Sequence, residues 1–389
     1  MLFKRKSLGE VEEEMITLLD FIDDAFKSYY WLRTRYESVQ EFIGNNEKCL
    51  SLIYHFLDLG HDDMTVLNKS NFNRASHIVI TYLIGLGIEK KTKMIAGANK
   101  FNSLPDEYLW MLTSLLHDYG YFRKELLSSK SLDDLKLKYD LLTDDYTEEA
   151  IDCLNDYSIN NAEYCTFSYE TIKNYYEYKR EYTSLHGSDE NSELNDHGIM
   201  GACLAFSQYI NFYIKYEYPR IYWDENDSRR KLQRTEPLLY KTACLVAAQH
   251  NLFKSGSASS DVIYQKYNLS ALLSTAPVQI DKKNPLLLLL SIVDTVECSK
   301  RFSKKTNPKK YLETMTILKN ISIEVNEDSI IVDFTNLHIF ITKRKDNKEL
   351  IEQLKKHINN IICIDTWTSY QGELIEPYKI SIQEQKDYI

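Results

Sequence analysis

The stretch LWMLTSLLHDYG, residues 109–120, decides the fold that the sequence predicts. Apolar side chains dominate it up to the pair His117-Asp118, which indicates an apolar helix with two polar side chains at its end. A Pro-Asp-Glu sequence just upstream suits a first helical turn, because proline fixes φ and carboxylates favour the positive end of a helix. We therefore predict a helix over residues 105–118, which Gly120 stops.

Four other polar side chains share this setting. Each lies within, or at one end of, an apolar helical pattern. The four are His77 in residues 73–90, His197 before residues 198–214, His250 after residues 237–249 and Asp294 within residues 285–302. Neighbours in the whole set lie about 40 to 80 residues apart, so only a fold that brings several helices around one centre can assemble them.

Such an assembly is typical of a metal site. An isolated buried carboxylate such as Asp294 is costly, so it must be paired, metal-bound or neutralised. Four imidazoles and two carboxylates make a nitrogen and oxygen donor set, which suits Fe, Mn, Zn, Ni or Co. A single histidine at a helix end is more often a capping or core residue, and it is the ordered set that favours a metal centre.

Composition supports a mainly α-helical fold. The 389 residues include 12 Gly and 7 Pro, which is about 5% of the chain against a usual share near 12%. Few turn-forming residues favour long helices over many short strands. The pattern changes after residue 307, where residues 321–325 and 329–334 alternate as strands and residues 347–361 indicate a helix.

Three parts are predicted along the chain. They are an N-terminal helical segment over residues 1–70 that packs on the core, a metal-binding helical domain over residues 71–306, and a small α+β domain over residues 307–389. Residues 8–58 are expected to be mostly amphipathic helix. The tyrosines of residues 169–182 either pack against the bundle or stack on a base, and residues 183–196 and 224–235 are expected to be polar breaks.

Charge argues against a nucleic-acid-binding domain of the usual basic kind. The formal net charge is −10 and the isoelectric point is about 5.5, whereas such domains are usually strongly basic. An anionic substrate would then need a local positive charge, and a metal ion is one candidate.

Cysteine usage and the apolar runs indicate the compartment. The seven Cys are widely spaced and include no CxxC pair, and Cys203 and Cys244 lie within apolar runs, which predicts core residues in a reducing compartment. The first residues lack the apolar stretch of a signal peptide. The apolar runs are far shorter than the roughly 20 residues that span a bilayer. We therefore expect a cytoplasmic protein with no membrane attachment.

The order of the six residues, H…HD…H…H…D, resembles that of the HD-domain metal-dependent phosphohydrolase superfamily. The LLHDYG sequence around the doublet is similar to the superfamily's LLHDxGK, and HGIMGA, which starts at His197, is similar to its HxxxGA. The resemblance covers about residues 70–305, and it implies an HD-domain helical bundle.

The resemblance also implies a role for each residue. One metal ion would be held by His77, His117, Asp118 and Asp294. Asp118 would be catalytic as the bridge to a second ion, held by His197 and His250, and a hydroxide between the two ions would attack a phosphoester. The implied cofactors are two divalent metal ions (Mn, Fe, Ni, Co, Mg or Zn). The implied substrate is a phosphorylated small molecule, a nucleotide or a nucleic acid.

Two cationic side chains are further candidates for catalysis. The Lys that often follows the doublet in the superfamily is Tyr121 here, so another cation would have to contact the phosphate. Helical spacing places Arg301 on the same face as Asp294 and Glu297, where it either reaches a phosphate or pairs with Glu297. Lys124 follows the doublet, and a solvated surface position is the competing interpretation for it.

Two other functions stay open. Some members of the HD fold, similar to inositol oxygenase, use the same ligand order to bind two irons and cleave C–H or C–C bonds with oxygen. A degenerate HD module would instead bind a ligand or partner without catalysis. The sequence also leaves a homo-oligomer open.

Overall fold

A computed structural model describes the parts of the chain that follow. They are residues 15–44, 48–49, 72–95, 106–120, 169–186, 197–212, 229–250, 252–253, 265–269, 272, 274–275, 285–302, 310–326, 329–344, 348–355 and 379–383. These parts are mostly helical, as the sequence predicts.

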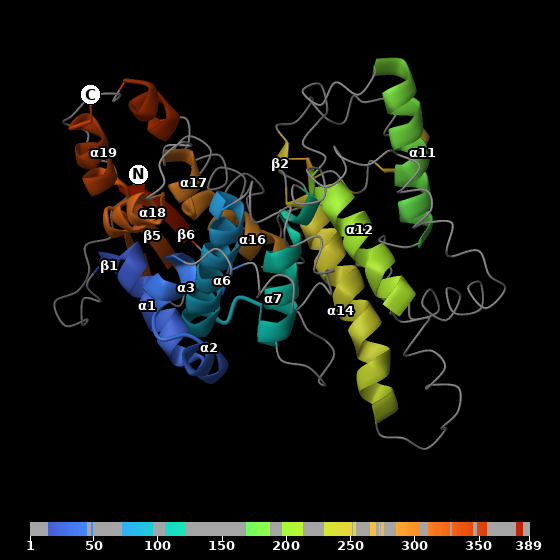
Figure 1. The fold of residues 1–389 in the computed structure, drawn as a ribbon, viewed down its shortest axis with the longest axis horizontal. Helices are drawn as coiled ribbons and strands as arrows, with labels where there is room; N and C mark the ends of the chain where they lie inside the picture. Colours follow the sequence, from blue (N-terminus) through green and yellow to red (C-terminus); the bar gives the residue numbers. More distant parts are fainter. Residues whose placement is uncertain are drawn as a thin grey trace.

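The helices that carry the predicted ligands pack on one another. They are α6 (Phe72–Thr92), α7 (Asp106–Leu116), α12 (His197–Phe212), α14 (Arg229–Gln249) and α16 (Pro285–Val296). Helices α12 and α14 run side by side, and α6, α7 and α16 lie between them and the N- and C-terminal elements (Figure 1). Apolar residues cover nearly all faces of α6 and α16, and such helices are buried by their neighbours.

Two glycines let α6 pack closely. A Cβ at Gly85 would lie 1.9 Å from the Trp110 ring, and a Cβ at Gly87 would lie 2.6 Å from the Phe21 ring. Trp110 Nε1–H donates a hydrogen bond to the carbonyl oxygen of Tyr82 at 2.9 Å. The Trp110 indole therefore holds α7 against α6, and it fits there because Gly85 has no side chain.

The N- and C-terminal parts of the described chain share one small sheet. Its strands are β1 (Ile16–Thr17), β4 (Ser322–Val325), β5 (Ser329–Asp333) and β6 (Lys379–Gln383), in the order β1-β4-β5-β6. The first two pairings are antiparallel and β5 pairs with β6 in parallel. Strands β4 and β5 confirm the prediction to within one residue, whereas β1 and β6 were not predicted.

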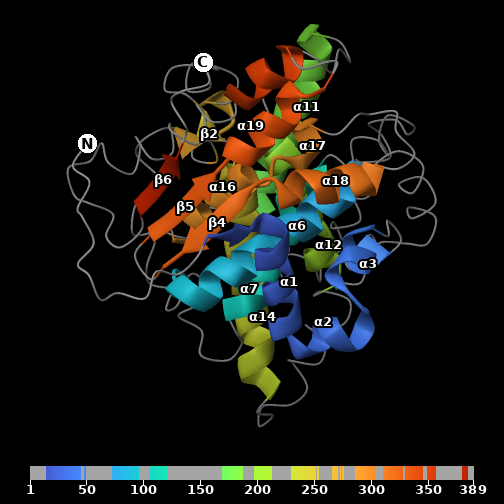
Figure 2. The ribbon, with the colours of Figure 1, turned by 90° about the vertical axis from the view of Figure 1, so that its left-hand side faces the viewer.

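The same parts of the chain hold several short helices. They are α1 (Leu18–Ser28), α2 (Tyr30–Arg35), α3 (Val39–Gly44), α18 (Lys310–Lys319) and α19 (Thr335–Thr342). Helix α1 packs on both α6 and α18, so the first described residues connect the sheet to the ligand-bearing helices (Figure 2). Residues 348–355 are helical, within the predicted 347–361.

Three predicted boundaries are wrong. Helix α14 begins at Arg229, inside the expected polar break, because its first turns hold straight-chain residues with high helix propensity. Helix α11 (Tyr169–His186) continues four residues into the expected loop from residue 183. The expected helix over residues 285–302 breaks after Val296 and resumes as α17 (Ser299–Phe302).

Several core predictions are confirmed. Cys203 and Cys244 are buried and form no disulfide. Tyr175 and Tyr178 on α11 are 4% and 0% exposed, so these two rings pack into the core.

Within the described residues, no helix combines the length and apolarity needed to cross a membrane.

Candidate metal centre

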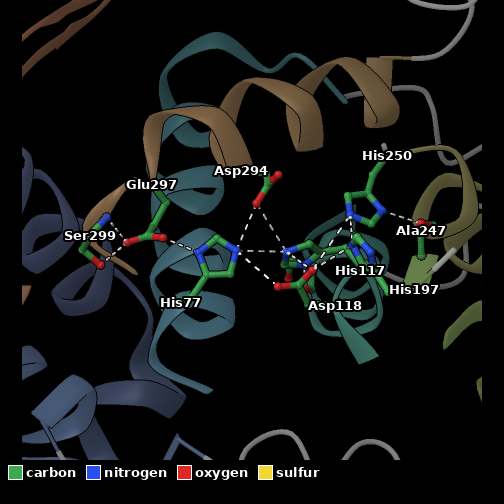
Figure 3. Close-up of polar contacts among 10 residues, drawn as sticks. His77, His117, Asp118, His197, Ala247, His250, Asp294, Glu297 and Ser299 are labelled. Carbon is green, nitrogen blue, oxygen red and sulfur yellow. Dashed lines mark hydrogen bonds and ion pairs between the residues drawn. The ribbon is translucent and has the colours of Figure 1, made fainter. Parts of the chain in front are cut away.

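The structure brings the six predicted ligands together from five helices. His77 lies on α6, His117 and Asp118 directly follow α7, His197 is the first residue of α12, His250 follows α14, and Asp294 lies on α16. Figure 3 shows the four imidazoles and two carboxylates converging on one region.

Glycines make this convergence possible. A Cβ at Gly120 would lie 2.0 Å from the carbonyl oxygen of His197, and a Cβ at Gly201 would lie 2.5 Å from the backbone nitrogen of Gly120. A Cβ at Gly198 would lie 2.6 Å from the carbonyl oxygen of Ala247 and 3.0 Å from the His250 ring. The end of α7, the start of α12 and the end of α14 can meet only because these positions have no side chain.

This changes the role expected for Gly120. The sequence predicts that Gly120 stops the helix after residue 118, but α7 already ends at Leu116 and residues 119–120 are helical again. The prediction is wrong because the glycine serves a close backbone approach to His197 rather than a left-handed helix cap.

Hydrogen bonds fix the orientation of three imidazoles. The Nδ1 atoms of His117 and His250 lie 2.6 Å and 2.5 Å from the carbonyl oxygens of Ser114 and Ala247. The Nδ1 atom of His77 contacts the Glu297 carboxylate. Because carbonyl and carboxylate oxygens accept, each Nδ1 carries a proton, and each Nε2 is the nitrogen that faces the centre.

The ligand atoms form two clusters that share Asp118. In the first cluster, His77 Nε2 lies 3.3 Å from His117 Nε2, 3.6 Å from Asp118 Oδ2 and 3.0 Å from Asp294 Oδ1. In the second cluster, Asp118 Oδ1 lies 3.3 Å from His197 Nε2 and 4.0 Å from His250 Nε2. Within each cluster, the ligand atoms of the histidines and Asp118 are all close enough to hold one metal ion.

The centre is buried, with Asp294 on its more open side. His77 and His117 are 0% exposed and Asp118 is 2% exposed. Asp294, expected as a buried carboxylate, is only partly buried: its side chain is 25% exposed, and its buried Oδ1 faces His77. Asp294 therefore lies at the edge of the first cluster.

Burial keeps His250 in the form that a metal requires. Desolvation, followed by the nearby His197 and His117, lowers the pKa of His250 from 6.5 to about 3. The ring is therefore neutral at physiological pH. A neutral imidazole is the form that binds metals.

The donor set fits divalent cations. His77 Nε2 and His117 Nε2 lie 3.3 Å apart, and in two neutral rings protonated at Nδ1 both atoms would be acceptors, which cannot form a hydrogen bond with each other. A cation beside both nitrogens and the Asp118 carboxylate satisfies all of them. Imidazole nitrogens with carboxylate oxygens suit Zn, Mn, Fe, Ni and Co.

The side chains of the two predicted cationic candidates lie outside the described part of the structure. Lys124 lies outside the described residues. Arg301 lies on α17, beyond the break that follows α16, so the uninterrupted helical spacing that put it on the face of Asp294 is wrong. Glu297, its suggested partner, contacts His77.

Glu297 is the residue that sequence reasoning missed. It was assigned only as a partner for Arg301. Glu297 follows Asp294 by three residues, and residues spaced i, i+3 lie on one helix face. This spacing indicates that Glu297 lies near the proposed metal ligands.

No model of a protein family, no curated protein and no solved structure matches the chain significantly.

Proposed function

We propose that the chain is a metal-dependent phosphohydrolase of the HD type. Its binuclear centre would hold one ion at His77, His117, Asp118 and Asp294 and a second at Asp118, His197 and His250. The observation that carries the proposal is the position of Asp118, whose Oδ2 faces His77 and whose Oδ1 faces His197. A carboxylate between two pairs of imidazoles is the arrangement that two neighbouring cations require.

Two divalent cations in such a site lower the pKa of bound water and neutralise the charge that develops on a phosphoryl group. The chain's own residues determine where this chemistry happens. Burial of His77 and His117 excludes bulk water from the first cluster, which strengthens electrostatic interactions there. The exposed side at Asp294 is where a phosphoester enters, and we propose a nucleotide or a nucleic-acid phosphoester as substrate.

The test is turnover by the full chain loaded with Mn²⁺, measured as release of phosphate or nucleotide from a panel of phosphomonoesters and phosphodiesters. We expect turnover that Asp118→Ala removes, because both ions lose their shared ligand. Asp23→Asn is a matched control, because Asp23 pairs with Lys27 on the surface of α1. Absence of turnover across the panel, or full turnover in Asp118→Ala, would contradict the proposal.

A second candidate is a diiron oxygenase. The specific observation in its favour is the set of four imidazoles, because nitrogen-rich sites also suit iron. Oxygen consumption by the iron-loaded protein, with no phosphoester turnover by the Mn²⁺ form, would favour this candidate. Metal binding with neither activity would favour a regulatory module.

A further inference from the structure

Glu297 is a buried carboxylate next to the proposed centre. It is 0% exposed and lies one residue beyond the end of α16. One oxygen, Oε2, contacts Nδ1 of His77. The other, Oε1, accepts a hydrogen bond from the backbone nitrogen of Ser299 at 3.0 Å and another from the Ser299 hydroxyl. Figure 3 shows Ser299, Glu297 and His77 in a row that leads to Asp118.

The break between α16 and α17 holds this carboxylate in place. The backbone nitrogen of Glu297 still donates to the carbonyl oxygen of Val293 at 2.9 Å, as in a helix. The next turn does not continue, because the backbone nitrogen of Ser299 donates to the Glu297 side chain. Two donors on Oε1 favour the ionised carboxylate, so Oε2 is an acceptor and His77 Nδ1 carries the proton.

The hydrogen-bond partner of His77 differs in charge from those of His117 and His250. The latter two donate to the neutral backbone carbonyls of Ser114 and Ala247. A carboxylate partner makes the imidazole a stronger ligand, and such outer partners typically contribute 10- to 100-fold to metal affinity. The effect is enhanced by burial, because a low dielectric strengthens charged hydrogen bonds.

From these contacts we propose that Glu297 is a positioning residue for the first metal ion. It fixes the tautomer and orientation of His77, strengthens His77 as a ligand and makes the first cluster the tighter of the two. Ser299 supports this role by holding the second oxygen of Glu297. The inference rests on the proposed binuclear centre.

The experiment titrates metal-free protein with Co²⁺ and follows heat and the visible absorption of the bound ion. In Glu297→Gln we expect one of the two ions to bind 10- to 100-fold more weakly, with the affinity of the other within twofold of the wild type. The absorption bands of the weakened ion should shift, because its histidine ligand has lost a charged partner. Ser299→Ala should change the same ion's affinity in the same direction by less.

Glu313→Gln is the matched control. Glu313 on α18 lies 2.9 Å from Arg344, and its side chain is 12% exposed, so the variant also removes a largely buried charge. It should bind both ions as the wild type does. A purely structural role for Glu297 would lower thermal stability in both Gln variants and leave both affinities unchanged.

Different outcomes separate this inference from the proposed function. Two ions bound with wild-type affinity by Glu297→Gln would overturn the role of Glu297 alone. A wild-type protein that binds no Co²⁺ would overturn the binuclear centre itself. Circular dichroism checks folding, and if Glu297→Gln does not fold, unchanged affinities in Ser299→Ala would overturn the inference.

Discussion

In the first cluster, His77 and His117 face the carboxylates of Asp118 and Asp294, with the charge of Glu297 behind His77. In the second cluster, His197 and His250 both lie near the Asp118 carboxylate. The Nδ1 atom of His250 donates to a neutral backbone carbonyl. Both clusters offer the same kinds of donor atom. The charge around them differs, so ions of equal charge should bind them with different strength.

The two clusters are also assembled differently. His77 lies within the long buried helix α6, where packed side chains fix its position. His197 and His250 lie at helix ends that meet through Gly120, Gly198 and Gly201. The first cluster therefore depends on the charges of its neighbours, and the second depends on close backbone contact.

Replacing single ligands should have the largest effects and should show which ion each cluster holds. We expect Asp118→Asn to lose tight binding of both ions, whereas His77→Ala and His250→Ala should each lose one. Each variant should lower phosphoester turnover by about 10³-fold, the size typical for removing a key electrostatic stabiliser. Elemental analysis of dialysed protein counts the ions. If His77→Ala and His250→Ala both lost two ions, the clusters would be one cooperative site rather than two.

The second-largest effects are expected from alanine at the glycines that bring the second cluster together. Gly120→Ala and Gly198→Ala put a Cβ against backbone carbonyl oxygens that cannot move aside, so we expect a loss of about 3 kcal/mol in the free energy of unfolding. The second ion should also bind more weakly. Urea unfolding and Co²⁺ titration measure the two effects.

Gly87→Ala is the control for these glycine variants. Its Cβ would meet the outer edge of the Phe21 ring, which can shift, and this contact lies between α1 and α6. It should lower stability by less and leave both ions bound. Equal loss of the second ion in Gly87→Ala would show that general destabilisation, not the local approach, controls the cluster.

Sequence patterns identified most of the centre because its residues are conspicuous. His77 lies within an apolar helix and His117 at the end of another, and buried polar side chains in such positions need a partner. The two strands near residues 322 and 333 were predictable from their alternation and the turn between them.

The missed features depend on contacts between distant parts of the chain. Local spacing predicts a continuous helix over residues 285–302, and it gives no sign that Glu297 contacts His77, which lies 220 residues away in the sequence. Strand β1 has two residues and pairs with β4, about 300 residues later, so no local pattern indicates it. Gly120 looked like a helix stop because its true neighbour, His197, is also remote in sequence.

Acid should destabilise the metal-free protein through His250. Its pKa is lowered to about 3 in the folded state, so the unfolded chain takes up a proton below pH 6.5 that the folded protein does not. Stability should therefore fall as pH decreases from 6.5 toward 3, by at most about 1.4 kcal/mol per pH unit from this residue. Urea unfolding with EDTA present measures the slope. His250→Gln should reduce it, and an identical slope in both proteins would contradict this assignment.

The smallest predicted effect concerns the N-terminal cap of α1, and it tests whether α1 influences metal binding at the first cluster. The Thr17 hydroxyl accepts a hydrogen bond from the backbone nitrogen of Asp20 at 3.1 Å and so caps α1, which packs on α6. Thr17→Ala should lower stability by about 1 kcal/mol, the usual cost of losing such a cap. Because His77 is fixed by its own buried neighbours on α6, Co²⁺ affinity should stay unchanged in a titration of the folded variant. Weaker binding of the first ion would instead mean that α1 helps to position His77, and the first cluster would then depend on packing as much as on charge.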